Sequence, residues 1–318
     1  MNGNHLKHSF LVIYPLLIYF VMVFVMQFLV LTVVSTADMY REFDKQYPNN
    51  SATLQETMEF SQNYMTEERT LELEKDMIRY SQSMSFLTNL ILLIPFLIIF
   101  FVRKKRMGKW YDTRPAWYWY VLTPVAGVAV CLGANLLLSV LGVTGAEEME
   151  PILENTAETT NVILSLQSSF AFKLISAGLI APLLEEVLFT GIMYREMRSE
   201  RSIGFSMFWI AALYAVNYGS LGGIIYGIFL SICVVFLYEK YRNLWAPILF
   251  HVGMNLFSVC AEYFNEFVND ALGSNFRVWV VLLFCICLAG FCFVLISSYV
   301  NKQDGSNNET EQESKISV

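Results

Sequence analysis

The sequence predicts an all-α polytopic membrane protein with about eight transmembrane helices, and two observations carry this prediction. Of its 318 residues, 55% are hydrophobic and only 15% are charged, whereas soluble proteins carry about 25% charged residues. The apolar residues also gather in long blocks, several of which reach the about 18 residues needed to cross a bilayer. One membrane domain therefore explains the composition better than two soluble domains.

The apolar blocks place the spans and divide the chain into regions. The predicted spans are 10–34, 84–102, 118–141, 169–193, 203–218, 222–238, 245–262 and 278–298. The regions are 1–164, with the first three spans; 165–265, with spans four to seven; 266–300, with the last span; and 301–318, a disordered cytoplasmic tail. The tail is predicted to be disordered because its polar composition cannot build a hydrophobic core.

Charge fixes the predicted orientation, because cytoplasmic connections of membrane proteins are enriched in Lys and Arg. Basic residues follow spans two, four and six: Arg103, Lys104, Lys105, Arg106, Lys109, Arg114, Arg195, Arg198, Arg201, Lys240 and Arg242. The opposite connections, after spans three and seven, are acidic. Both termini are therefore predicted in the cytoplasm and segment 35–83 outside it. Within that segment, Leu54 to Tyr80 predicts an amphipathic helix that runs into span two.

Two adjacent carboxylates interrupt the apolar sequence of span four. Glu185 and Glu186 stand nine residues before Arg195, which places them about 13 Å inside the cytoplasmic edge. Burial of a charged group at that depth costs about 3 kcal/mol or more, so such groups normally face a water-filled cavity. Since neighbours on a helix differ by about 100°, the two carboxylates have different surroundings, and Pro182 predicts a kink just before them. The alternative is that span four ends before Glu185 and leaves both carboxylates at the interface.

Span seven carries a second polar pair. Pro247 suits the first turn of a helix, and His251 lies nine residues past Arg242, at a depth similar to that of the glutamates. His251 and Asn255 are four residues apart and share a helix face. A histidine in a membrane helix is also a common structural hydrogen-bonding group, so both interpretations stay open.

Asn217, near the end of span five, is the last candidate. Its side chain either enters the same chamber as the other polar groups or caps the end of its helix. A straight helix from Arg201 would place Asn217 about 24 Å inside the membrane, deeper than the glutamates. The candidate site is therefore formed by Glu185, Glu186, Asn217, His251 and Asn255.

These residues, with their order and spacing, resemble the CPBP intramembrane proteases, also called the Abi family. That family includes the type II CAAX prenyl endopeptidases and bacterial bacteriocin-processing or self-immunity proteins. Its Glu-Glu-x-x-x-Arg motif corresponds here to Glu185 through Thr190, and its Phe-x-x-x-His motif to Leu213 through Asn217. Its His-x-x-x-Asn motif corresponds to His251 through Asn255, after Trp245-Ala246-Pro247-Ile248. The resemblance covers about 165–265.

The resemblance implies an endopeptidase that cleaves a peptide or lipidated protein segment with a glutamate-activated water. Carried over to this chain, Glu185 is the general base and Glu186 an auxiliary carboxylate. His251 and Asn255 are the polar groups near the developing oxyanion. The resemblance also implies an integral, multi-pass protein of a bacterial cell membrane, with the lipid bilayer and the substrate as its partners.

Two departures from the family pattern support a different function. Asn217 stands where the family has a histidine, and an amide cannot accept a proton as imidazole does. Loss of a positioned acid–base group costs about 10²–10⁴-fold in rate. Thr190 stands where the family has arginine, which leaves Glu186 without its expected partner unless Arg195 or Lys173 substitutes. The alternative is thus an impaired family member that acts as a scaffold, regulator or bacteriocin-immunity protein.

The sequence supports few other ligands. No cofactor is predicted, and a divalent metal has little support because there is no HExxH motif and only one membrane histidine. The acidic outward connections suggest a protein partner outside the cytoplasm, while nucleic acid is not expected. A transporter with a proton relay ranks lowest, because no inverted repeat or pair of broken helices is visible.

Overall fold

The computed structural model describes residues 3–48, 51–64, 66–107, 117–143, 169–216, 221–263, 281–293 and 295–297. The regular structure of these residues is helical, without strands. Asn217, the acidic connections predicted after spans three and seven, and the predicted disordered tail lie outside the described residues. The helices are α1 (Gly3–Gln46), α2 (Leu54–Asn63), α3 (Glu67–Met107), α4 (Trp119–Val143), α6 (Phe170–Ile175), α7 (Ala181–Glu185), α8 (Arg195–Arg198), α9 (Ile203–Val216), α10 (Leu221–Tyr241) and α11 (Trp245–Tyr263), with π-helical segments η3 (Ser176–Ile180) and η4 (Glu186–Tyr194).

The helices identify an all-α integral membrane protein. Three stretches are long and apolar enough to cross a bilayer: Ser9–Gln46, Gln82–Lys105 and Phe170–Arg198. Shorter apolar helices occupy Trp119–Ala134, Ile203–Val216, Trp245–Ala261 and Val281–Ser297. These stretches, together with α10, overlap the spans expected from the sequence. The eight-span topology itself stays a prediction.

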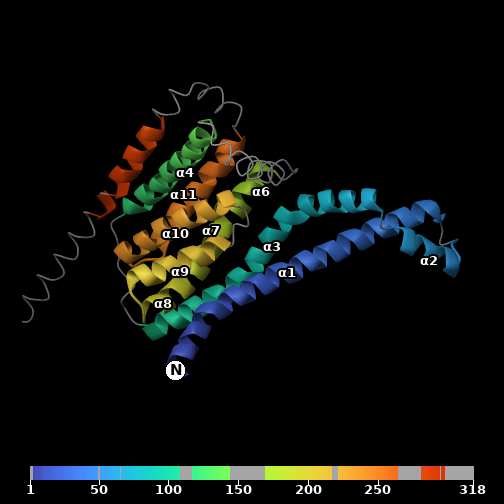
Figure 1. Ribbon diagram of the computed structural model, residues 1–318, viewed down its shortest axis with the longest axis horizontal. Coiled ribbons are helices and arrows are strands. Elements are labelled where there is room, and N and C mark those ends of the chain that lie inside the picture. Colours follow the sequence, from blue (N-terminus) through green and yellow to red (C-terminus); the bar gives the residue numbers. More distant parts are fainter. Residues whose placement is uncertain are drawn as a thin grey trace, which may run out of the picture.

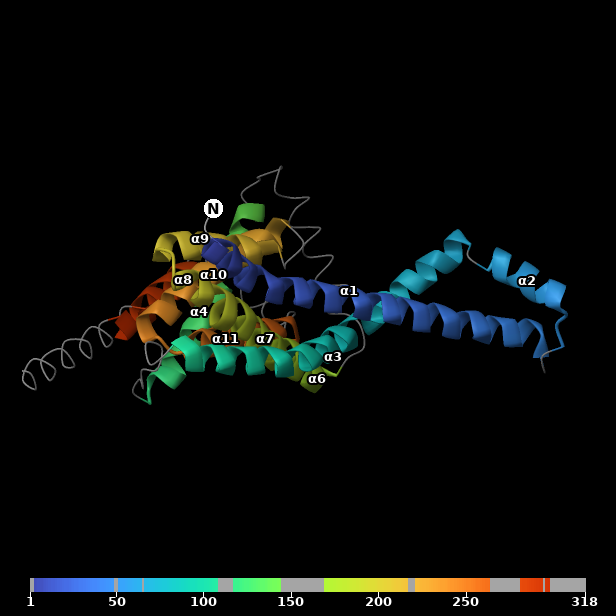
Figure 2. The same cartoon turned by 90° about the horizontal axis from the view of Figure 1, so that it is seen from below.

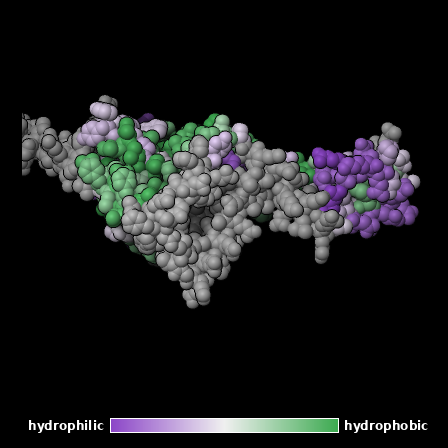
Figure 3. Space-filling view, turned by 90° about the horizontal axis from the view of Figure 1, so that it is seen from above, coloured by the Kyte–Doolittle hydropathy of each residue, from purple (hydrophilic) through white to green (hydrophobic). Residues whose placement is uncertain are grey.

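The molecule has a helical bundle and a long arm (Figures 1 and 2). The arm consists of α2, the part of α1 after residue 35 and the part of α3 before residue 83. It contains the segment predicted to lie outside the cytoplasm. The far end of the arm is hydrophilic, whereas the bundle presents apolar surface on the same face of the molecule (Figure 3). This division of the surface fits a bundle in lipid and an arm in water.

The arm departs from the single helix expected over 54–80. Helix α2 begins with a capping box. The Thr53 side chain accepts a hydrogen bond from the backbone N–H of Glu56, and the Glu56 side chain accepts one from the backbone N–H of Thr53. It ends at Asn63, and the Arg69 backbone N–H then donates to the Thr66 hydroxyl at the start of α3. Two separate helix starts, each with its own capping hydroxyl, therefore divide the expected helix.

Close backbone contact fixes α11, the helix of span seven, against α4. A Cβ atom added at Gly127 of α4 would lie 2.0 Å from the carbonyl oxygen of Phe250. A Cβ atom added at Gly253 of α11 would lie 2.2 Å from the carbonyl oxygen of Pro124. Only glycine permits this approach at either position. The crossing sets the position of α11 and of its polar side chains.

Segment η4 lies at the centre of the bundle. All nine of its residues are buried, and it contacts α1, α3, α9, α10 and α11. Apolar side chains of η4, such as Leu188, Phe189 and Ile192, belong to one continuous core. Glu186, its first residue, is therefore held inside the bundle by the burial of its apolar neighbours.

Candidate active site

The helix of span four is irregular where it carries the two glutamates. In place of one kink at Pro182, two π-helical segments, η3 and η4, flank the short α7. Pro182 has no backbone N–H to donate to the carbonyl of Gly178 within η3. A π-helical turn changes the direction of every side chain after it and often marks a functional site. Glu185 ends α7 and Glu186 begins η4, so the register changes between the carboxylates.

Glu186 is completely buried and has a partner at each carboxylate oxygen. Its Oε1 lies 2.9 Å from Nδ1 of His251, and its Oε2 accepts from the Thr190 hydroxyl at 2.6 Å. Thr190 lies four residues later on the same helix, within reach of Glu186. The threonine at the position of the family's arginine thus supplies a hydrogen-bond donor without a positive charge.

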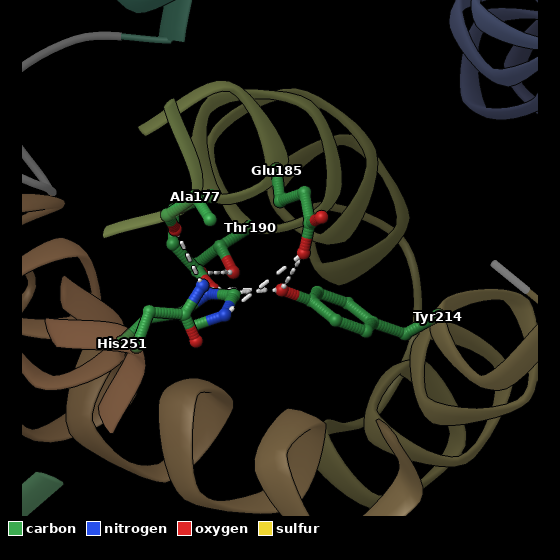
Figure 4. A network of polar contacts seen from close by, with 7 residues as sticks. Ala177, Glu185, Thr190, Tyr214 and His251 are labelled. Carbon is green, nitrogen blue, oxygen red and sulfur yellow. Dashed lines mark hydrogen bonds and ion pairs between the residues drawn. The ribbon is translucent and has the colours of Figure 1, made fainter. Parts of the chain in front are cut away.

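Tyr214 of α9 joins the glutamates to His251 (Figure 4). Its hydroxyl lies 2.9 Å from Oε2 of Glu185, 3.1 Å from Oε1 of Glu186 and 3.1 Å from Nδ1 of His251. The ring is fully buried and packs on Phe189 of η4, with ring centroids 4.4 Å apart. Three separate helices therefore supply the four side chains of this cluster.

Glu185 differs from Glu186 in exposure and in partners. Its side chain is 18% exposed, whereas that of Glu186 is 0% exposed. Its Oε2 lies 4.0 Å from Nε2 of His251, which is too long for a direct hydrogen bond. His251 thus presents one ring nitrogen to each carboxylate, closely to Glu186 and at a distance to Glu185.

Asn255 lies one turn beyond His251 and is anchored to the irregular helix. Its Nδ2 donates to the backbone carbonyl of Ala177 in η3 at 2.9 Å. An amide nitrogen carries two N–H donors, so one donor of Asn255 is used by this bond. Asn217, the fifth predicted site residue, lies outside the described residues.

The sequence analysis missed Tyr214 as a member of the cluster. A tyrosine in an apolar span usually belongs to the core, and the motif comparison drew attention to Asn217 instead. The available signal was that Tyr214 lies three residues before Asn217 and so shares its helix face. A buried tyrosine hydroxyl also needs a polar partner, which pointed to a polar group opposite it.

The cluster does not fit a resident metal ion. Among the described residues, no three His, Cys, Asp or Glu side chains are arranged as metal ligands. The donor set is two carboxylates and one imidazole, and Nδ1 of that imidazole is already in contact with Glu186. Zinc sites in proteins use three or four protein ligands with nitrogen or sulfur donors predominant. This set of donors therefore differs from that of a zinc site.

The sequence of this region matches a known protein family. Residues 167–257 match the family described as Type II CAAX prenyl endopeptidase Rce1-like. The match covers less than a third of the chain. It confirms the resemblance drawn from the three motifs, and the matched region contains both glutamates, Tyr214 and the whole of the His251 to Asn255 motif.

One curated relative supports the same assignment. It is named "Putative membrane peptidase YdiL" and comes from Bacillus subtilis (strain 168). It is 22% identical over 143 residues, which is 45% of this chain and 56% of the relative. The chain thus matches only about half the length of this relative. No solved structure is a significant match to this chain.

Proposed function

We propose that the protein is an intramembrane endopeptidase that hydrolyses a peptide bond with a water molecule activated by Glu185. The observation that carries this proposal is the convergence of Glu185, Glu186 and His251 in one buried cluster, with Glu185 alone partly exposed. Buried carboxylates inside a membrane are costly and mark functional sites. The match to the Rce1-like family supports the same class of reaction.

The distance between Glu185 and His251 suits a bridging water. Their nearest atoms, Oε2 and Nε2, are 4.0 Å apart, so one oxygen atom between them can hydrogen-bond to both. Glu185 takes a proton from this water as the oxygen attacks the peptide carbonyl. Glu185 then gives that proton to the leaving nitrogen as the C–N bond breaks. The products are a new carboxyl group and a free amine.

Glu186 prepares His251 for this step. A carboxylate facing Nδ1 holds the proton on that nitrogen, and the Thr190 hydroxyl occupies the other carboxylate oxygen. Nε2 of neutral His251 then points toward Glu185 as an acceptor, and as a donor once the ring is protonated. The second N–H of Asn255 is the further donor that we assign to the developing oxyanion.

An apolar groove supports a substrate that arrives from the membrane. The groove has a volume of about 320 Å³ and lies between α1, α8 and α9. Its apolar lining residues are Val12, Ile13, Met197, Phe205, Trp209 and Leu213, and Glu196, Glu200 and Arg201 also line it. Leu213 directly precedes Tyr214, so the groove and the cluster share helix α9. We therefore propose a lipidated or strongly apolar polypeptide segment as the substrate, which enters from the cytoplasmic side.

The proposed topology is multi-pass, in a bacterial cell membrane, with both termini in the cytoplasm. The apolar helices at the predicted spans support it, as does the alternation of basic and acidic connections in the sequence. Labelling intact cells with a membrane-impermeant maleimide tests it on a variant without native cysteines. Arg41→Cys in the arm should react from outside, and Lys104→Cys should react only after lysis.

The activity can be tested with the full chain in lipid nanodiscs. Quenched fluorescent peptides that end in a prenylated cysteine are compared with the same peptides without the lipid. We expect cleavage of the lipidated peptides by the wild type and a loss of about 10³-fold or more in Glu185→Gln. Equal cleavage by Glu185→Gln would refute the proposed role of this carboxylate.

The second candidate function is that of an impaired family member, a scaffold, regulator or immunity protein. Asn217 favours it, because the family's second-motif histidine is missing, although Thr190 already supplies Glu186 with a donor. This candidate predicts no cleavage by the wild type and a gain of cleavage in Asn217→His. Cleavage by the wild type that Asn217→His leaves unchanged would exclude it.

A further inference from the structure

We propose that Tyr214 is the positioning residue of this site: its hydroxyl holds Glu185 at a water-bridging distance from His251 and fixes which ring nitrogen of His251 carries the proton. This inference rests on the proposed function and deepens it. It starts from a contact pattern, since the Tyr214 hydroxyl lies within 2.9–3.1 Å of Glu185, Glu186 and His251 at once. The family's second motif leaves the position of Tyr214 unspecified, and the residue reaches the cluster from a different helix than either glutamate.

The contact distances favour one placement of the protons. A tyrosine hydroxyl has a single proton to donate, and its shortest contact is with Glu185. The Nδ1 proton of His251 is then donated to Glu186, at 2.9 Å, and the Thr190 proton to the other oxygen of Glu186. In this arrangement Glu185 accepts from Tyr214 and each oxygen of Glu186 accepts from one donor, Nδ1 of His251 or Thr190. Nε2 of His251 stays unprotonated toward Glu185.

Glu185 depends on this one hydroxyl for its orientation. In the part of the chain that the structure describes, the hydrogen bond from Tyr214 is the one that fixes the Glu185 carboxylate. Its other short-range partner, Nε2 of His251, is 4.0 Å away. The titratable groups around Glu185 are Glu186, Tyr214, His251 and, from α10, Tyr226. Without the hydroxyl, nothing among these groups holds the carboxylate at a bridging distance from His251.

The tyrosine ring itself is held rigidly. It is fully buried and packed against Phe189, so removal of the hydroxyl alone should leave the ring in place. Tyr214→Phe therefore isolates the hydrogen bond from the packing. The chain also offers a matched control. Tyr194 is a second fully buried tyrosine whose hydroxyl donates to a glutamate, Glu239, at 2.6 Å, away from the cluster.

The kinetic test compares these two variants in nanodiscs with the lipidated peptide substrate. We expect Tyr214→Phe to lower kcat by about 100-fold, because a small misplacement of the reacting groups has that effect, with KM within about two-fold. Its pH–rate profile should also differ from that of the wild type, because Glu185 loses its hydrogen-bond donor. Tyr194→Phe should keep the profile of the wild type. Equal rates and profiles in the two variants would overturn the proposal.

A second measurement does not depend on catalysis. The chain has three histidines, two of them in the N-terminal tail, so the ¹⁵N signals of His251 can be assigned with a His251→Gln variant. We expect an Nδ1-protonated ring in the wild type and a changed tautomer in Tyr214→Phe. An unchanged His251 signal would overturn the proposal even if the wild type cleaves peptides. If the wild type cleaves nothing, the endopeptidase function fails, while a changed signal still supports the positioning role.

Discussion

The arm and the polar cluster of the candidate site each hold a carboxylate with a tyrosine, but the third partner differs. In the arm, Asp38 accepts from Tyr64 and pairs with Arg69 at 3.5 Å. In the cluster, Glu185 accepts from Tyr214, and its third partner is the imidazole of His251. The two carboxylates are almost equally exposed, 17% for Asp38 and 18% for Glu185. Exposure therefore does not separate the two regions.

The difference lies in the chemistry of the partners. A guanidinium stays protonated at any ordinary pH and keeps its carboxylate ionised. Imidazole instead exchanges protons with a carboxylate near neutral pH. The ion pair in the arm holds two helices together, whereas we propose that the cluster keeps a proton movable. The following predictions test this contrast, from the largest expected effect on stability to the smallest.

The largest effect is expected at Glu186. In Glu186→Gln, an amide NH₂ replaces one acceptor and faces a donor, either the Thr190 hydroxyl or Nδ1 of His251. Disruption of a buried pair of this kind costs about 3–5 kcal/mol. Thermal unfolding in detergent should show a greatly reduced midpoint. Glu42→Gln in the arm, which removes an exposed ion pair with Lys45 and Arg69, should leave the midpoint nearly unchanged. Equal effects would contradict the contrast.

The next effect is expected at the crossing of α4 and α11. In Gly253→Ala the new methyl group meets the Pro124 carbonyl oxygen at 2.2 Å. Such overpacking costs about 1–3 kcal/mol or more, and the shift of α11 should also move His251 and slow peptide cleavage. The control is Gly204→Ala in α9, where no atom lies within 4 Å of the added methyl group. That variant should unfold at or above the wild-type temperature.

A smaller effect is expected at Thr190. Thr190→Val keeps the shape of the side chain but leaves Oε2 of Glu186 without its donor. A buried acceptor that loses its partner costs about 1–3 kcal/mol, and cleavage should slow about tenfold because His251 is held less firmly. Thr190→Ser keeps the hydroxyl and should retain most of the stability and most of the cleavage rate. If valine and serine behaved alike in unfolding and cleavage assays, the Thr190 hydroxyl would have no role.

The smallest effect is expected in the arm, at Tyr64. Burial, together with the hydrogen bond that Tyr64 donates to Asp38, raises the pKa of Tyr64 to about 12. The neutral phenol is thus favoured in the folded arm, so its stabilising contribution is complete below about pH 10, the ordinary tyrosine pKa. It is lost as the pH rises from there to about 12. Tyr64→Phe should remove about 1 kcal/mol and this pH dependence, without a change in peptide cleavage.

The sequence predicted the membrane class and three of the four cluster residues by their depth. Glu185, Glu186 and His251 stand out because charged or polar groups in apolar spans are rare. Their spacing from Arg195 and Arg242 predicts similar depths. Tyr214 was missed because its type is common in apolar cores, and its role depends on which face of α9 meets the cluster. That orientation follows from tertiary packing against Phe189, which a single sequence does not display.

The local backbone was the other part that sequence patterns did not provide. Pro182 predicted an irregularity in span four, but not π-helical segments on both sides of α7. The choice between α and π turns depends on how the surrounding helices bury each residue, not on the proline alone. In the arm, the break after Asn63 was missed because a capping hydroxyl such as Thr66 is a weak signal within a polar segment.

The most direct test of the account is a matched pair of carboxylate-to-amide substitutions. Cleavage of a lipidated peptide is measured under single-turnover conditions for Glu185→Gln and for Asp38→Asn, two carboxylates with similar exposure and a tyrosine partner. We predict a loss of about 10³-fold or more for Glu185→Gln and a rate within about two-fold of the wild type for Asp38→Asn. A Glu185→Gln variant that cleaves as fast as Asp38→Asn would contradict the central claim.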